Sequence, residues 1–200
     1  MSREALPIRT ILPGLIFILL IDVLAWMGVG SDGSVIATGF LILLPWVTLL
    51  ITRRSPAAFG YVRERAVARY GWGMVAGGVW RGLSMGLNYL ILRPPVSLGS
   101  TWTQLISSLI LVPFVEETFY RGYLGRSLAG KLGRWPGIII QAGLFSLYPI
   151  HWNQGWPAIV SIFGFGILSG WLVERTGSIW IGWGAHGFAN ILPILLLRFV

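Results

Sequence analysis

The sequence has 200 residues, of which 55% are apolar and 11% are charged, whereas a soluble domain carries about 25% charged residues. The net charge of +8 does not indicate nucleic-acid binding, because the arginines flank long apolar runs and form no separate basic patch with interleaved aromatic side chains. The absence of cysteine excludes disulfide bonds, thiolate metal sites and a cysteine nucleophile. These features predict an integral membrane protein that contacts the lipid bilayer.

Seven apolar segments follow one another at roughly the 20-residue length that a bilayer requires. They are Ile11–Val29, Val35–Ile51, Gly71–Leu92, Leu98–Tyr123, Gly137–Ile150, Pro157–Val173 and Ser178–Leu197. The first segment exceeds the ~7–15-residue core of a signal peptide, so we interpret it as a retained span. No repeat or linker divides the chain. We therefore expect one all-α domain over residues 1–200, a polytopic transmembrane helix bundle of about seven spans.

The loop arginines and lysines predict the orientation of these spans. With the N-terminus in the cytoplasm, eleven of the fifteen basic residues fall in cytoplasmic segments and two in external ones. The remaining two, Arg81 and Arg121, lie within spans. Cytoplasmic loops of membrane proteins carry an excess of arginine and lysine. The pattern therefore favours an odd number of spans with the N-terminus inside.

The fourth segment carries three ionisable residues, Glu116, Glu117 and Arg121. Such residues are expensive inside a membrane, so they indicate a functional site. Glu117 and Arg121 are spaced i,i+4 and share a helix face, which predicts an ion pair. Glu116 lies roughly 100° around the helix from Glu117 and has no such partner. A purely structural ion pair that fixes helix packing is the alternative interpretation.

Both histidines of the chain lie in or beside the last three apolar segments. Glu116 and His151 are nearly equidistant from the turn at residues 133–135, which predicts similar depths, roughly 25 Å from that turn at ~1.5 Å per residue. We therefore expect these two side chains to meet. His186 lies shallower on the same count, and Asn190 follows it at i+4 on one helix face.

These residues resemble the motifs of one enzyme family. EETFYR, from Glu116 to Arg121, is similar to the EExxxR motif of the CAAX prenyl protease and bacteriocin-processing family of intramembrane endopeptidases, also called the abortive-infection family. The stretch HGFAN, from His186 to Asn190, resembles the family's HxxxN motif. In place of the family's FxxxH motif, Pro149 stands four residues after Phe145 and His151 follows two residues later. Either the chain is deformed at Pro149 or this motif is degenerate.

The resemblance covers about residues 98–197 and implies hydrolysis of a peptide bond within the membrane. Glu116 and His151 would activate a water molecule as general base. His186 and Asn190 would stabilise the oxyanion, and Glu117 and Arg121 would orient the other site residues. The implied substrate is a membrane-embedded or lipid-anchored protein or peptide, such as a CAAX tail or a bacteriocin leader, in a bacterial or archaeal cell membrane.

A metal ion is a separate question. Glu116, His151 and His186 are a possible zinc-ligand set with room for a water. However, the HExxH spacing of zinc peptidases is absent, so we expect no obligatory cofactor.

Two rival functions remain. A serine intramembrane protease would need a GxSG loop, and the nearest stretch, GILSG at 166–170, has one residue too many. A non-catalytic or degenerate membrane protein, such as a transporter subunit or scaffold, could use the same buried polar cluster. Transporters, however, more often place interrupted spans in both halves of the chain.

Overall fold

The computed structural model of the protein describes residues 6–27, 35–92 and 102–198. Within these ranges the chain forms only helices and turns, which confirms the all-α class. Three short 3-10 helices are η1 (Ile8–Thr10), η2 (Pro56–Phe59) and η5 (Pro149–Gln154). The longer helices before the central run are α1 (Leu12–Trp26), α2 (Val35–Thr52) and α3 (Ala66–Leu92), and those after it are α7 (Arg134–Ser146), α8 (Trp156–Thr176) and α9 (Ile179–Arg198).

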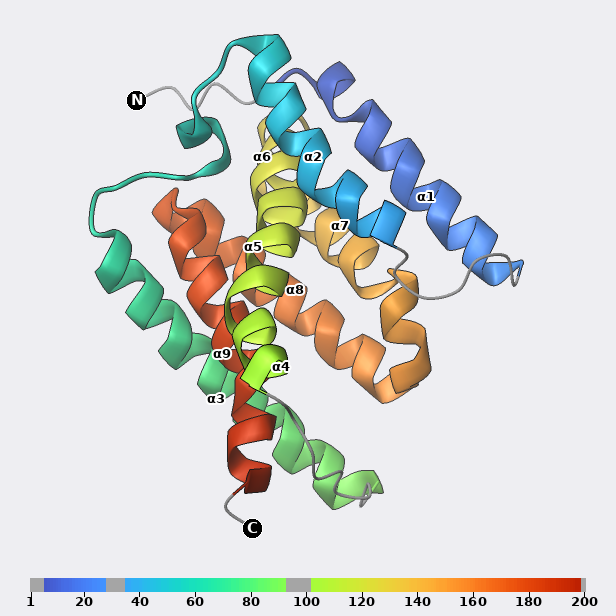
Figure 1. Ribbon diagram of the computed structural model, residues 1–200, viewed down its shortest axis with the longest axis vertical. Helices are drawn as coiled ribbons and strands as arrows, with labels where there is room; N and C mark the ends of the chain where they lie inside the picture. The colour runs from blue at the N-terminus through green and yellow to red at the C-terminus, as the bar shows by residue number, and fades with distance from the viewer. Residues whose placement is uncertain (1–5, 28–34, 93–101, 199–200) are drawn as a thin grey trace.

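The centre of the bundle is one continuous helical run that contains two π-helical segments. Its parts are α4 (Trp102–Ile106), η3 (Ser107–Leu111), α5 (Val112–Glu116), η4 (Glu117–Gly125) and α6 (Arg126–Leu132). The segments η3 and η4 are π-helical, a form that is rare and frequent at functional sites. All nine residues of η4 are buried. Figure 1 shows the run with α2, α7, α8 and α9 around it.

Short turns place the C-terminal helices beside each other. Gly133 has φ +94° between α6 and α7, and Gly177 has φ +68° between α8 and α9. These are backbone conformations that glycine adopts without steric cost. The amide of Gly177 also donates to the carbonyl of Val173, which satisfies an end carbonyl of α8. As a result, α9 turns back against α8 and brings its side chains to η4.

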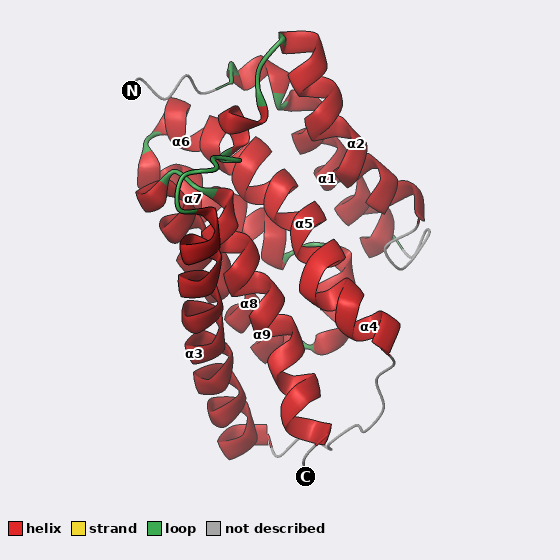
Figure 2. Ribbon diagram, turned by 60° about the vertical axis from the view of Figure 1, so that its left-hand side comes forward, coloured by secondary structure: helices red, strands yellow, loops and turns green. Residues whose placement is uncertain are grey.

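The closest helix pair is α3 with α9, which run in parallel (Figure 2). Glycines make this approach possible, because a Cβ atom on Gly73 would overlap the backbone of Ile181 and one on Gly77 would overlap that of Ala185. Small residues four apart allow transmembrane helices to pack backbone against backbone. The N-terminal half of the chain is therefore held directly against the helix that carries His186.

The outer surface of the bundle is apolar. On α3, Val75, Val79, Leu83 and Leu87 recur once per turn and are exposed, whereas the exposed face of a helix in water is polar. In the described part of the chain, two helices, Trp156–Thr176 and Ile179–Leu196, are long and apolar enough to cross a membrane. The helices Leu12–Trp26 and Ala37–Thr52 are apolar but shorter. The number of seven spans and the cytoplasmic N-terminus stay predictions.

Candidate active site

Glu117 is the centre of a buried polar network that joins η4, α8 and α9. Its carboxylate accepts a hydrogen bond from Ser169 Oγ at 2.8 Å and lies 2.9 Å from Nδ1 of His186. The Nε atom of Arg121 lies 3.4 Å from the same carboxylate, so the ion pair expected from the i,i+4 spacing is present. Because both carboxylate oxygens are engaged, Glu117 holds the imidazole of His186 in one orientation.

Arg121 reaches Glu117 from between two aromatic rings. Its guanidinium carbon lies 4.1 Å from the centre of the Phe145 ring and 5.9 Å from that of Phe165. A planar guanidinium stacks well on aromatic faces, which compensates part of the loss of water. This packing explains how a charged side chain with 1% exposure is accommodated in the core.

Glu116 faces the other nitrogen of the same histidine. Its Oε2 atom lies 3.5 Å from Nε2 of His186, so the imidazole stands between two glutamates. Since the short contact joins Nδ1 to a carboxylate, we assign the Nδ1 hydrogen as the donor to Glu117. Nε2 is then the nitrogen that can exchange a proton with Glu116.

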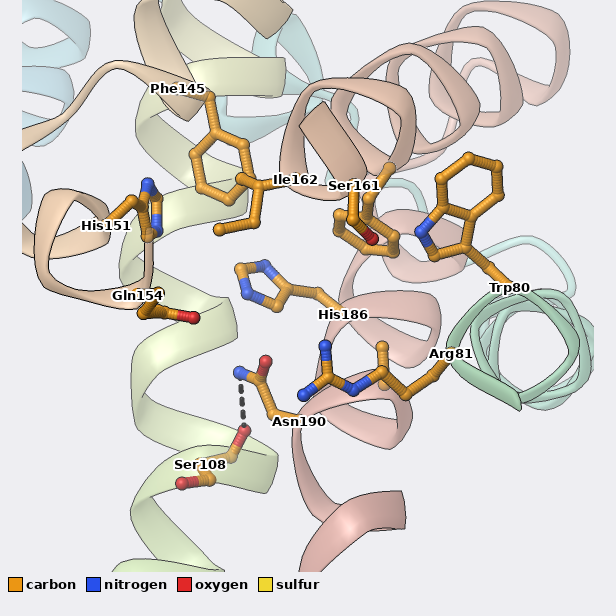
Figure 3. Close-up of a pocket in the computed structure, with 12 residues that line it drawn as sticks. Trp80, Arg81, Ser108, Phe145, His151, Gln154, Ser161, Ile162, His186 and Asn190 are labelled. Atoms are coloured by element: carbon orange, nitrogen blue, oxygen red, sulfur yellow. Dashed lines mark hydrogen bonds between the residues drawn. The ribbon is translucent and has the colours of Figure 1, made fainter. Parts of the chain in front are cut away.

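A cavity of about 250 Å³ lies beside His186 (Figure 3). His151 and Asn190 line it together with His186, and the aromatic ring of Phe145 contacts both imidazoles. The amide of Asn190 donates to the carbonyl oxygen of Ser108 in η3 at 3.3 Å. One N–H of this amide is thus fixed to the helix run, and its other N–H remains for a ligand in the cavity.

The structure therefore gathers all six expected site residues, but the pairing differs from the expected one. Glu116 meets His186, and no hydrogen bond or ion pair joins it to His151. The depth count assumed a straight α-helix. The π-helical segment η4 lies between Glu116 and the turn at residues 133–135, so this part of the run rises less per residue than the count assumed.

His151 reaches the cavity because the chain bends before it. Helix α7 ends at Ser146, and Pro149 begins the short helix η5. The imidazole of His151 is 8% exposed and its ring centre lies 5.1 Å from that of Phe145. Of the two alternatives for the altered FxxxH motif, the deformation at Pro149 is the one found.

Two positioning residues were missed by the sequence analysis. Ser169, the hydrogen-bond donor to Glu117, lies in the GILSG stretch that was considered only for a serine protease. Gly182 lies one turn before His186, and a Cβ atom there would stand 2.5 Å from the Glu117 carboxylate. Neither position carries a signal in the sequence, since a serine or glycine within an apolar span is common.

The donor set does not fit a metal ion as it stands. Among the residues that the structure describes, no three histidine, aspartate or glutamate side chains are close enough together to hold one. The expected set of Glu116, His151 and His186 is therefore not arranged as a ligand sphere.

Comparison with known proteins gave one result. Residues 98–192 match the model of the family described as type II CAAX prenyl endopeptidase Rce1-like. Neither the search of curated proteins nor the search of solved structures gave a match. The matched segment contains all six residues of the candidate site. Residues 98–192 of this chain thus form an Rce1-like domain of the type II CAAX prenyl endopeptidase family.

Proposed function

We propose that the protein is an intramembrane endopeptidase that hydrolyses a peptide bond near the end of a prenylated, membrane-associated protein. The observation that carries this proposal is the position of His186 between Glu116 and Glu117, at the wall of a cavity. A cell membrane of bacterial or archaeal type is the proposed location, as the likeness to bacteriocin-processing enzymes implies.

The charges of the network support a role in proton transfer. Glu117 and Arg121 compensate each other. Glu116 and His186 have no net charge when they share one proton. The pair is then either a carboxylic acid with a neutral imidazole or a carboxylate with an imidazolium. A buried cluster without net charge avoids the large cost of an isolated charge. The pair can therefore move one proton without charging the core.

In the reactive state Glu116 is the carboxylate and His186 carries both ring protons. A water molecule bound between Glu116 and the cavity gives a proton to Glu116 while its oxygen attacks the carbonyl carbon of the substrate, with His151 as a second group that orients the water. The carbon–nitrogen bond then breaks, and the proton passes from Glu116 to the leaving amine. The products are a new carboxylic acid and a new amine, and the enzyme returns to its starting state.

The oxyanion of the tetrahedral intermediate needs hydrogen-bond donors. His186 and Asn190 lie one turn apart on α9 and both line the cavity. The Nε2–H of His186 and the free N–H of Asn190 can therefore bind the same oxygen atom. Donors that are fixed before the reaction are commonly the largest contribution to catalysis. Glu117, Ser169 and Arg121 act as positioning residues that hold His186.

Replacement of Glu116 by glutamine tests this function. We expect Glu116→Gln to lower cleavage by roughly 10²- to 10⁴-fold, the usual contribution of a general base, while the amount of protein in the membrane stays normal. Glu64→Gln, a change at an exposed glutamate before α3, is the matched control and should cleave normally.

The measurement compares membrane proteomes of cells that express the three proteins, followed by cleavage of an identified substrate in detergent. Wild-type cleavage by Glu116→Gln would overturn the catalytic assignment. A wild-type protein that changes no membrane protein and cleaves no prenylated peptide would instead favour the non-catalytic role.

A further inference from the structure

Arg81 of α3 reaches the same cavity from outside the matched domain. Figure 3 shows its guanidinium directed toward the side of the cavity where Asn190 lies. The Nε atom is buried and has no hydrogen-bond partner, and no ion pair to Arg81 exists among the described residues. No aspartate or glutamate is among the residues that line the cavity. Arg81 thus places a permanent positive charge at the wall of the cavity, and no carboxylate among the lining residues balances it.

The packing of α3 against α9 fixes this position. Gly73 and Gly77 touch the backbone of α9 at Ile181 and Ala185, and Arg81 follows at the next i+4 position of the same face. One turn further along α9 lie Ala189 and Asn190, which line the cavity. Because the helices are in backbone contact before this point, the backbone of Arg81 is held close to α9.

A partly buried guanidinium whose Nε–H is unpaired costs free energy, and a carboxylate is the group that compensates it best. Arginine and a carboxylate form paired, charge-assisted hydrogen bonds of fixed geometry. The glutamates of the site do not pair with Arg81, because Glu117 contacts Arg121 and His186, and Glu116 faces His186. The anion must therefore come from a ligand.

The size of the cavity limits what that ligand is. Its volume of about 250 Å³ lies below the ~300–1,000 Å³ of typical small-molecule sites. A volume of this size suits a short piece of extended chain. On so short a piece of substrate peptide, the simplest source of a carboxylate is the C-terminus of the substrate.

We propose that Arg81 binds the C-terminal carboxylate of the substrate and so sets the distance between the chain end and the bond that is cut. This inference rests on the proposed peptidase function. The site residues of α9 act on the peptide bond, and Arg81 holds the last residue of the fragment that is released. Arg81 is in this way a specificity-determining residue contributed by the N-terminal half.

The test uses three synthetic peptides that differ only at the end. Each peptide has a farnesylated cysteine followed by three residues. The first ends in Val-Ala-Leu with a free carboxylate, the second in Val-Ala-Leu carboxamide, and the third in Val-Ala-Asp carboxamide. Binding is measured with the Glu116→Gln protein, so that it does not depend on cleavage, and kcat/KM is measured with the active protein. The variants are Arg81→Gln, Arg81→Lys and, as control, the exposed Arg63→Gln.

We expect the parent protein to prefer the free carboxylate over the carboxamide by roughly 10- to 100-fold, as for a desolvated charged hydrogen bond. Arg81→Gln should reduce this preference to near one, Arg81→Lys should keep part of it, and Arg63→Gln should keep all of it.

Retention of the preference by Arg81→Gln, or equal binding of acid and carboxamide by the parent protein, overturns the inference. Equal binding of the Asp-carboxamide peptide and the free acid overturns the specificity for the chain end. Loss of cleavage of all peptides together with an intact acid preference in binding would reject the peptidase function and keep the anion site.

Discussion

Among the residues that the structure describes, Arg121 is the largest fully buried side chain, and its surroundings make its charge testable. Arg121→Leu keeps most of the apolar contact with Phe145 and Phe165 but leaves Glu117 without its cation. Breaking a buried pair costs about 3–5 kcal/mol in soluble cores. We therefore expect a clear fall in the melting temperature in detergent, together with loss of activity.

The double variant Glu117→Gln with Arg121→Leu removes both charges and should recover part of the lost stability, though not the activity. Glutamine retains an oxygen that accepts from Ser169 or His186. If Arg121→Leu melts like the wild type, or if the double variant loses the full sum of the two single losses, Glu117 and Arg121 are not energetically coupled.

Chelation tests the chemistry of the same residues. Because Glu116 and His186 can move a proton between themselves and no ligand sphere surrounds them, a strong chelator should leave most of the cleavage activity intact. Activity that disappears on chelation and returns with stoichiometric zinc alone would show that the residues rearrange around a metal.

For single residues, the sequence predicted the pair of Glu117 and Arg121 but not the other contacts of Glu117. The contact of Glu117 with Arg121 follows from helical spacing alone, because both residues lie on one element. The contacts of Glu117 with Ser169 and His186 depend on how three helices pack, which spacing within one element does not determine. Arg81 was visible as an ionisable residue in a span, but only the packing against α9 places it at the cavity.

At the scale of the elements, the contact between α3 and α9 depends on single glycines. Gly77→Ala places a Cβ atom against the backbone of Ala185, so the helices must separate. Overpacking of this kind typically costs about 1–3 kcal/mol. We expect a lower melting temperature and reduced cleavage, because Arg81 and His186 move apart with their helices.

Gly82 provides the matched control, since a Cβ atom there meets nothing within 4 Å. Gly82→Ala on the same helix should leave the melting temperature unchanged or slightly higher, as alanine favours helix by up to about 1 kcal/mol. Equal behaviour of the two variants would mean that the close approach of α3 and α9 does not contribute to stability.

The apolar segments predicted where helices lie along the sequence. They did not predict which parts of these helices are π-helical. Each apolar segment overlaps helical structure in the described ranges, although the expected segment Gly137–Ile150 is interrupted where α7 ends at Ser146. The π-helical winding of η3 and η4 leaves no pattern in composition, because it arises from contacts with other helices rather than from local preference. The depth counted for Glu116 assumed a straight α-helix and did not anticipate its contact with His186.

For the whole molecule, the orientation in the membrane is the main untested expectation. The chain has no cysteine, so single cysteines can be introduced without background. With the N-terminus inside, Ser55→Cys should be protected in intact cells from a membrane-impermeant maleimide, and Gln154→Cys should be labelled. Labelling of Ser55→Cys with protection of Gln154→Cys would reverse the assigned orientation.

The buried network also has a consequence for how the protein is made. The segment with Glu116, Glu117 and Arg121 leaves the ribosome before α8 and α9, which bring Ser169 and His186. An ionised side chain near the bilayer centre costs about 2.5–3.5 kcal/mol on insertion scales. The segment is therefore a poor candidate for independent entry into lipid, and its residence there depends on helices synthesised later. We therefore expect the network to be complete only after α9 has been synthesised. Chains that end before α9 would leave these charges uncompensated and open to degradation by the cell's quality control.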